Sequence, residues 1–308
     1  MGLQGRKGYP MARALHDALW NWFCEFDAEA LIGGFAVTDQ VPEPGIIRNF
    51  LGTRITPAVY PPVLAALAGA VEPPPAPGNW HADIAEWAAA LRSVALAQAA
   101  GRGTYRIVEA GCGWGCWMTN MGVAARARGL AVDLIGIEAD ASHLVNAADT
   151  LALNGFAPDA YRLHHGVAGP RAGRAIFPAA GAAGWGGAAI FGASAADLAR
   201  AAGRADVAVL DCLTLADLAG GQPVDLLHID IQGAEADFVT GNADDIAAHV
   251  RRVLIGTHSR AIEGRLFTHF ETLGWRLEME RSAIALSVGG RPVIRIDGVQ
   301  LWANPRLD

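Results

Sequence analysis

Acidic side chains beside a glycine-rich turn are the first residues in this sequence whose types and spacing indicate chemistry. The stretch EAGCGWG (109–115) follows the apolar residues RIV and precedes a segment of helical character. Glycines at such a turn permit backbone angles and a close approach to a ligand that a side chain would block. Glu109 stands two residues before the first of these glycines. We therefore expect the turn to bind a ligand that carries positive charge.

Two classes of nucleotide cofactor use a glycine turn of this kind, and the sequence separates them. A dinucleotide fingerprint, G-x-G-x-x-G, would place its third glycine at position 116, where this chain has cysteine. A pyrophosphate is also disfavoured beside the carboxylate of Glu109. S-adenosylmethionine (SAM) carries an ammonium and a sulfonium, so a nearby carboxylate suits it. The turn therefore favours SAM and disfavours a nicotinamide-dependent oxidoreductase.

A second acidic residue supports the same cofactor. The segment DLIGIEAD ends as a strand at Glu138, where a carboxylate can accept both ribose hydroxyls. Ala139 would then lie under the adenine ring. Of the histidines that end the next strand, we prefer His165 to His164 as a contact of the base, because adjacent strand residues point to opposite faces. The predicted cofactor-binding residues are Glu109, Gly111, Cys112, Gly113, Trp114, Glu138, Ala139, His165 and Asp230.

Polar side chains also end two later strands, and they indicate where a reaction would occur. Asp230 ends the otherwise apolar segment DLLHID, and His258 ends the following predicted strand. Neighbouring strands lie about 4.8 Å apart, so both side chains can face one pocket. His258 has an ordinary pKa close to neutrality, which suits a general base. The predicted catalytic residues are His258, Asp230 and Glu235.

Neighbouring residues leave several details of this site open. Glu263 could orient the imidazole of His258, and Arg260 could pair with a carboxylate or hold an anionic group of the substrate. Glu235 could be only a favourable charge at a helix N-terminus. Asp230, Glu235 and His258 could instead hold magnesium or manganese to lower the pKa of an acceptor hydroxyl. A histidine is an unusual ligand for magnesium, so no metal ligand is assigned.

The aromatic residues around the glycine turn have a separate expected role. Trp114 could shield the methionine end of the cofactor, and Trp80 and His81 are candidates to close over it. Cys112 and Cys116 have no second pair to complete a zinc tetrahedron, so we expect no zinc site at the turn.

Alternating strand and helix patterns position these residues. Short apolar strands alternate with helices from about residue 105 to residue 275, and two strands joined near Gly289-Gly290 end the chain. Such alternation requires a parallel sheet that is covered on both faces. The Gly/Ala-rich stretch 166–194 interrupts the order, and we expect a long loop with a weak hairpin there. Residues 1–78, broken by proline-rich segments, are expected to form a helical cap, separate from residues 79–308.

Composition limits the classes of partner. The 308 residues are 52% hydrophobic and 18% charged, with a net charge of −7, so we expect a large packed core. The lack of a basic excess argues against nucleic acid as a partner. No segment has the length and apolar character of a membrane span or a secretory signal. With four scattered cysteines and no disulfide framework, the chain is expected to be cytoplasmic.

Three later segments carry a family resemblance. VDLLHIDIQGAEADFV (224–239), LIGTHSRAIEGRLFTHFETLGW (254–275) and DGVQLWANPRL (297–307) resemble the FkbM family of SAM-dependent methyltransferases. The resemblance implies an α/β fold with a Rossmann-like class I methyltransferase sheet, mostly parallel with a closing antiparallel hairpin. It also implies methyl transfer to a hydroxyl of a small molecule, commonly a sugar or a polyketide-type natural product. The residues before 79 lack the family motifs and are expected to help select the acceptor.

Two other functions stay open on the residues alone. One is a catalytically silent nucleotide-fold binding protein, and the other is an N-methyltransferase acting on a small molecule or peptide. Four polar groups at strand ends argue against a silent protein, because such a protein has no chemical need for them. These groups are Glu109, Glu138, Asp230 and His258.

Overall fold

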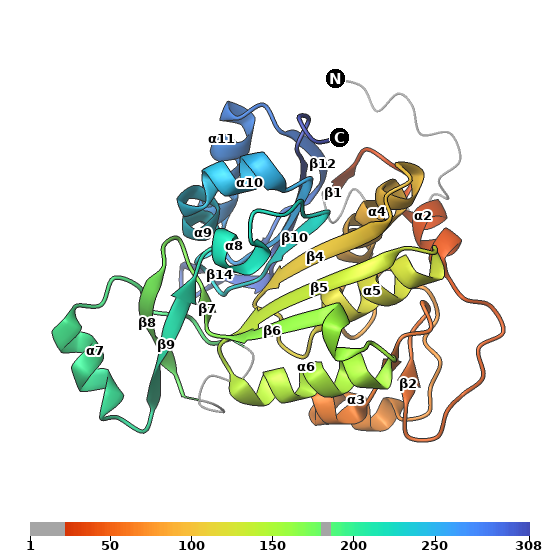
Figure 1. Ribbon diagram of the computed structural model, residues 1–308, viewed down its shortest axis with the longest axis horizontal. Coiled ribbons are helices and arrows are strands. Elements are labelled where there is room, and N and C mark those ends of the chain that lie inside the picture. Colours follow the sequence, from red (N-terminus) through yellow and green to blue (C-terminus); the bar gives the residue numbers. More distant parts are fainter. Residues whose placement is uncertain (1–21, 180–185) are drawn as a thin grey trace.

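An eight-stranded, mostly parallel sheet runs through the centre of the computed structural model (Figure 1). The structure describes residues 22–179 and 186–308; residues 1–21 of the predicted cap and residues 180–185 of the Gly/Ala-rich stretch lie outside the described residues. In spatial order, the strands are β1 (Trp22–Cys24), β12 (Arg276–Arg281), β15 (Gly298–Ala303), β11 (Arg252–Thr257), β10 (Leu226–Ile229), β4 (Thr104–Ala110), β5 (Ala131–Glu138) and β6 (Tyr161–His165).

The strand order confirms the predicted class I methyltransferase sheet. The strands from β11 to β6 pair in parallel, while β15 is antiparallel to both β11 and β12. The chain fills the sheet outward from β4 to β6 and then returns to the other side of β4 to form β10 and β11. The topology therefore switches between β4 and β10, and ligands of open α/β sheets bind at the carboxyl ends of such strands.

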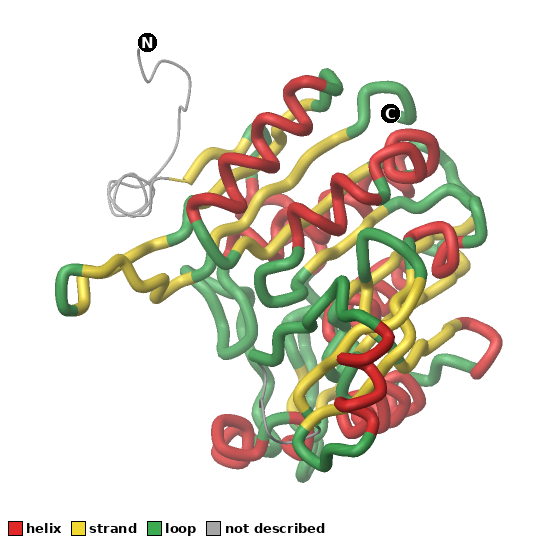
Figure 2. The backbone as a smooth tube through the Cα atoms, turned by 90° about the vertical axis from the view of Figure 1, so that its left-hand side faces the viewer, coloured by secondary structure: helices red, strands yellow, loops and turns green. Residues whose placement is uncertain are grey.

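Helices cover both faces of this sheet, as buried parallel strands require. Figure 2, a quarter turn from Figure 1, shows helices on both sides of the strands. One face packs against α4 (Ile84–Ala99), α5 (Cys116–Ala127) and α6 (Ala141–Leu153), with α2 (Ala28–Phe35) beside α4. The other face packs against α8 (Leu215–Ala219), α9 (Glu235–Gly241), α10 (Ala243–His249) and α11 (Arg260–Thr272).

Alternation along β4 divides its side chains between the two layers. Ile107 lies in the core under α4 and α5, whereas Val108 lies in the core under α8 to α11. Glu109, two residues after Ile107, therefore points to the face that α5 covers. None of the helices in the described parts of the chain is both long enough and apolar enough to cross a membrane.

The described part of the predicted cap is more than helical. β1 extends the central sheet through β12, and β2 (Ile47–Arg48) pairs with β3 (Arg54–Ile55). The rest of the segment holds the short helix α3 (Pro61–Leu64) and two 3-10 turns (Pro57–Val59, Ala65–Leu67). Strands of two or three residues have no readable periodicity, so the sequence predicted helices alone. Side chains of this segment share a hydrophobic core with α4; a domain boundary at residue 78 stays a prediction.

The Gly/Ala-rich stretch is not simply a loop. β7 (Val167–Ala168) and β8 (Gly173–Pro178) both pair with β9 (Val207–Leu213) in a separate three-stranded sheet, and α7 (Ala195–Ala202) packs on it. This unit lies to one side of the central sheet in Figure 1. Within the stretch, Ile176 and Ile190 form an isolated antiparallel bridge, which agrees with the expected weak hairpin. The main partner of β8, however, is β9, a strand that the sequence analysis did not assign.

The final two predicted strands each divide in two. β13 (Ile284–Val288) and β14 (Arg291–Ile296) form a separate antiparallel hairpin, while β12 and β15 stay in the central sheet. Gly289 and Gly290 make the hairpin turn with positive φ angles of 58° and 77°, which confirms the predicted junction.

The turn after β4 passes very close to the end of β10. Gly111 has a φ of +77°, and a Cβ atom added there would lie 1.9 Å from the carbonyl oxygen of Asp230. Gly129, just after α5, has a similar φ of +79° with no heavy atom within 4 Å of an added Cβ. Gly111 is therefore required by close approach as well as by its backbone angle.

Replacing these two glycines separates the two requirements. Gly129→Ala should cost about 1–2 kcal/mol of unfolding free energy, the cost of a left-handed alanine. Gly111→Ala should cost at least about 2 kcal/mol more, because the added methyl group overlaps the backbone of β10. Urea denaturation measures both. Equal losses would contradict the close approach of the turn to Asp230.

Candidate functional site

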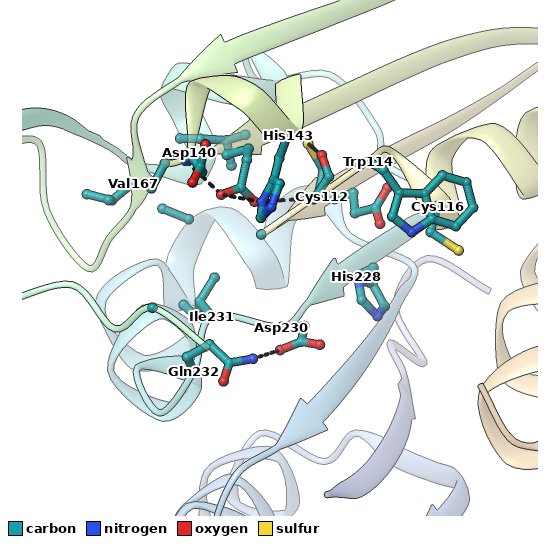
Figure 3. A pocket seen from close by; sticks show the side chains of 18 of the residues that line it. Cys112, Trp114, Cys116, Asp140, His143, Val167, His228, Asp230, Ile231 and Gln232 are labelled. Carbon is teal, nitrogen blue, oxygen red and sulfur yellow. Dashed lines mark hydrogen bonds and ion pairs between the residues drawn. The ribbon is translucent and has the colours of Figure 1, made fainter. Parts of the chain in front are cut away.

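A cavity of about 410 Å³ opens at the carboxyl ends of β4, β5 and β10 (Figure 3). This volume is within the range of small-molecule sites in proteins. Its walls come from the glycine turn, the strand ends, the separate three-stranded sheet and the segment before α4. The predicted residues that line it are Glu109, Gly111, Cys112, Gly113, Trp114, Glu138, Ala139 and Asp230.

Glu138, at the end of β5, links this strand to the glycine turn. Its two carboxylate oxygens accept the backbone N–H groups of Gly113 and Asp140, both at 2.9 Å. Burial opposes ionisation of this carboxyl, but the nearby imidazole of His143 and the hydrogen bonds from these two N–H groups outweigh it and lower its pKa. Glu138 is therefore an ionised acceptor that faces the space beside the glycine turn.

Glu109 lies beneath the first turn of α5. Its oxygens accept the backbone N–H groups of Trp117 at 3.1 Å and Met118 at 2.8 Å, so it satisfies donors that every helix N-terminus leaves unpaired. Burial raises its pKa to about 8 despite these two bonds. A cation bound in the cavity would favour the ionised form of this carboxyl.

Aromatic residues from two parts of the chain meet beside Glu109. Trp80 stacks on Trp114, with ring centroids 5.8 Å apart, and His81 contacts both Trp114 and Trp117. The Nε2 atom of His81 is 2.5 Å from the sulfur of Cys116. Trp80, His81 and Trp114 all line the cavity, as the sequence analysis expected.

His165 is a correction to the predicted site. Its ring is exposed, lies 3.1 Å from the carbonyl oxygen of Ala139, and does not line the cavity. His164 is also absent from the lining. The physical reason is that β6 ends beside β5 at the sheet edge, and the chain reaches the cavity only with Gly166 and Val167.

The three predicted catalytic residues meet at the ends of β10 and β11. The Nδ1 atom of His258 is 2.8 Å from Glu235 Oε1, and its Nε2 atom is 3.4 Å from Asp230 Oδ1. The same Glu235 oxygen accepts the backbone N–H groups of Ile231 and Gly233. Of the three residues, only Asp230 lines the cavity. Asp230 therefore stands between the cavity and the His258–Glu235 pair.

Mutual attraction sets the protonation of this triad. Burial lowers the pKa of His258, but its hydrogen bond to Glu235 and the charge of Asp230 more than compensate and raise it to about 9. Desolvation raises the pKa of Asp230 to about 6, although 44% of its side-chain surface is exposed. At neutral pH the imidazole is therefore protonated on both nitrogens, and one N–H group faces each carboxylate. His258 was predicted as the general base, and this proton argues against that role.

Two supporting residues differ from expectation. Glu263 does not touch the imidazole: it accepts hydrogen bonds from Thr257 Oγ1 and the backbone N–H of Ala283, and Glu235 orients His258 in its place. Arg260 lies 3.6 Å from Glu263 with 62% of its side chain exposed, away from the cavity. Its helical position three residues before Glu263 explains this pairing.

Several lining residues were not assigned from the sequence. Gln232 donates to Asp230 Oδ1 at 3.0 Å from a backbone with a φ of +55°, a rare angle for a residue other than glycine. His143, one turn into α6, contacts Glu138, and His228 lies inside β10. An imidazole inside the apolar segment DLLHID was a readable signal for His228. Tyr60, from the segment after β3, had none.

The charge of the lining is one-sided. Its ionisable carboxyls belong to Glu109, Glu138, Asp140 and Asp230, and the described lining contains neither lysine nor arginine. Such a surface favours a ligand with positive charge and disfavours a diphosphate.

Comparison with known proteins follows this geometry. No protein-family model matches the chain. A protein of Jannaschia sp. (strain CCS1) that bears the name "Putative methyltransferase" is 51% identical over 275 residues, which cover 89% of this chain and 97% of that protein. The chain belongs to the methyltransferases.

Solved structures that this methyltransferase resembles include methyltransferase FkbM from Methylobacillus flagellatus KT and precorrin-6Y C5,15-methyltransferase from Geobacter metallireducens GS-15. The first is 13% identical with a TM-score of 0.43 over 71% of this chain, and this chain spans about half of its length (54%). The second is 11% identical with a TM-score of 0.37, covering 68% of this chain and 86% of that one. The fold is assigned from the strand order of this protein's own sheet, not from these similarities.

A substitution that removes the charge of Glu235 but keeps its size tests the triad. In Glu235→Gln we expect the pKa of His258 to fall by at least about one unit, because the charge and the hydrogen bond that stabilise the imidazolium are weakened. Asp237→Asn removes a carboxylate from the same helix, far enough into solvent to serve as the control. NMR titration of the His258 ring measures both variants. An unchanged pKa in Glu235→Gln would exclude stabilisation of the imidazolium by Glu235.

Proposed function

We propose that this methyltransferase uses SAM and methylates a hydroxyl group of a small molecule. The observation that carries the proposal is the acidic pair, Glu109 and Glu138, on either side of the glycine turn in a cavity whose described lining has no basic side chain other than histidine. A carboxylate at the end of β5 suits ribose hydroxyls. The ammonium and sulfonium of SAM suit an acidic lining.

Each part of the cavity has an expected role toward the cofactor. Glu138 would accept the ribose hydroxyls, and Ala139 would lie against the adenine. The turn at Gly111 and Gly113 would let the backbone approach the central part of the molecule. When bound, SAM supplies a methyl group on a positively charged sulfur. The protein residues must then hold the acceptor in line, exclude water and receive a proton.

Asp230 is the residue placed to act on the acceptor. It lines the cavity, and its pKa near 6 makes it a stronger base than an ordinary aspartate while leaving it mostly ionised at neutral pH. His258 and Glu235 stand behind it and fix the carboxylate. We assign Asp230 to accept the hydroxyl proton, and His258 with Glu235 to position Asp230 and stabilise its charge.

The separate three-stranded sheet supplies an apolar wall for the acceptor. Phe177 of β8, with Ala189 and Phe191 from the segment packed against this sheet, lines the cavity. Aromatic faces bind the ring of a sugar or the hydrocarbon of a polyketide-type product through apolar contact. This wall and the resemblance to the FkbM family both support such an acceptor.

Calorimetric titration tests the cofactor. SAM and its demethylated product, S-adenosylhomocysteine, should bind with micromolar affinity, and NAD should not bind. Glu138→Ala should weaken both adenosyl compounds by about 1–3 kcal/mol, because buried hydrogen bonds to the ribose are lost. Asp149→Ala, at an exposed position of α6, is the control and should bind as the wild type does. Unchanged affinity in Glu138→Ala would refute the ribose assignment, and binding of NAD alone would refute the function.

A divalent cation is a separate question at the triad. One ligand atom from each of Asp230, Glu235 and His258 lies within 4.8 Å of the others, and Glu235 Oε2 is buried without a hydrogen-bond partner. The donor set thus fits a manganese ion in number and type. The imidazolium, however, already neutralises the carboxylates that would bind the ion. We propose that the proton, and not a metal, occupies this position at neutral pH.

Titration with manganese chloride measures this choice directly. We expect no one-to-one binding in the micromolar range at pH 7, because the ion would have to displace the proton of His258. His258→Ala is the matched variant. Stoichiometric binding to the wild type that disappears in His258→Ala would establish a metal site and refute the proton-only triad.

A further inference from the structure

One buried imidazole in the cavity has no assigned role. His228 is 3% exposed, lines the cavity, and its Nδ1 atom has no hydrogen-bond partner. A buried polar atom without a partner costs free energy, so its presence calls for a ligand that completes it. Figure 3 shows the ring beneath Trp114 and Cys116, at one end of the group of side chains drawn.

The sheet places this ring opposite the ribose end of the cavity. His228 pairs in register with Glu109 of β4, and β4 lies between β10 and β5. Two strand spacings of about 4.8 Å therefore separate β10 from the strand of Glu138, a span of roughly 10 Å. A nucleoside held at Glu138 and passing over the glycine turn would bring the chain attached to its 5′ carbon toward His228.

The other imidazoles of the lining are already engaged. His81 contacts the sulfur of Cys116, and His143 lies 3.8 Å from Glu138. His228 has a ring contact with Trp117, with centroids 5.5 Å apart, and no hydrogen bond engages its Nδ1 atom. The described lining contains no lysine or arginine, so an anionic group at this end must bind to neutral donors, and the imidazole of His228 is one of them.

We propose that His228 binds the α-carboxylate of the cofactor's methionine moiety through a ring N–H. This inference rests on the proposed use of SAM and specifies how the amino acid end of the cofactor is recognised. Glu109, across the strand pair, is then the partner of the α-ammonium. The end of the cavity formed by Glu109, His228, Trp114 and Trp117 is thus a subsite for a zwitterionic amino acid.

Three adenosyl compounds test the subsite by calorimetry. S-adenosylhomocysteine has the carboxylate, its decarboxylated analogue keeps only the amine, and 5′-methylthioadenosine lacks both. The wild type should bind S-adenosylhomocysteine at least about tenfold more tightly than the decarboxylated analogue, the effect of one hydrogen bond to a charged group. His228→Leu should lose this preference while binding the other two compounds within about twofold of wild type.

Two further variants keep the result interpretable. His228→Gln retains an N–H donor of similar reach and should recover part of the preference, whereas Glu138→Ala should weaken all three compounds together. His228→Leu should also melt no lower than the wild type, because the lost nitrogen had no partner in the free protein. A merely structural histidine would instead lower the melting temperature and leave the carboxylate preference intact, which would overturn the proposal.

The test separates this inference from the proposed function. If the wild type binds none of the three compounds, the use of SAM is refuted and the subsite with it. If all three bind and the preference for the carboxylate survives in His228→Leu, only the role of His228 is refuted.

Discussion

The capture of backbone N–H groups by two buried carboxylates is the interaction on which the cavity depends. Glu109 accepts the N–H groups at the start of α5, and Glu138 accepts those of Gly113 and Asp140. Together they fix the start of α5 and the glycine turn against β5. Without these acceptors, the turn would present unpaired buried donors to the cavity. Glu138, whose lowered pKa keeps it ionised, also gives the cavity negative charge, so this arrangement contributes both to the shape of the site and to the sign of the ligand it favours.

The close approach of the glycine turn to β10 links this arrangement to the reactive side of the cavity. Gly111 lies directly against the carbonyl of Asp230, so the position of the turn determines where β10 ends and where the Asp230 carboxylate can point. Gln232 lies in the turn that follows β10 and has a strained backbone, and its side chain donates a hydrogen bond to that carboxylate. Strain of this kind persists only where the surrounding structure enforces it. The glycine turn and the end of β10 are therefore in direct contact, so the Glu109 and Asp230 sides of the cavity adjoin.

Much of this could be predicted from the sequence because it follows from periodicity and strand ends. The alternation of apolar strands and helices predicted the parallel sheet, and polar residues at strand ends predicted the grouping of Asp230, Glu235 and His258. What failed depended on pairing between distant segments. β9 joins β8 rather than the main sheet, and β1 adds to the sheet edge through β12, neither of which leaves a local signal. His165 does not line the cavity because β6 is the edge strand of the sheet, and its position at the edge depends on pairing that the sequence does not show.

Protonation state was the least predictable property, and two histidines show why. His228 and His258 are both at least partly buried, toward the ends of adjacent strands. Burial without a charged partner lowers the pKa of His228 to about 3. Two carboxylates instead raise the pKa of His258 to about 9. The residue type alone allows either outcome. A neutral imidazole can both donate and accept, which suits recognition of a polar ligand. An imidazolium held by two carboxylates can only donate, which suits fixing Asp230 in place. The environment, and not the identity of the side chain, therefore sets the protonation state of each imidazole.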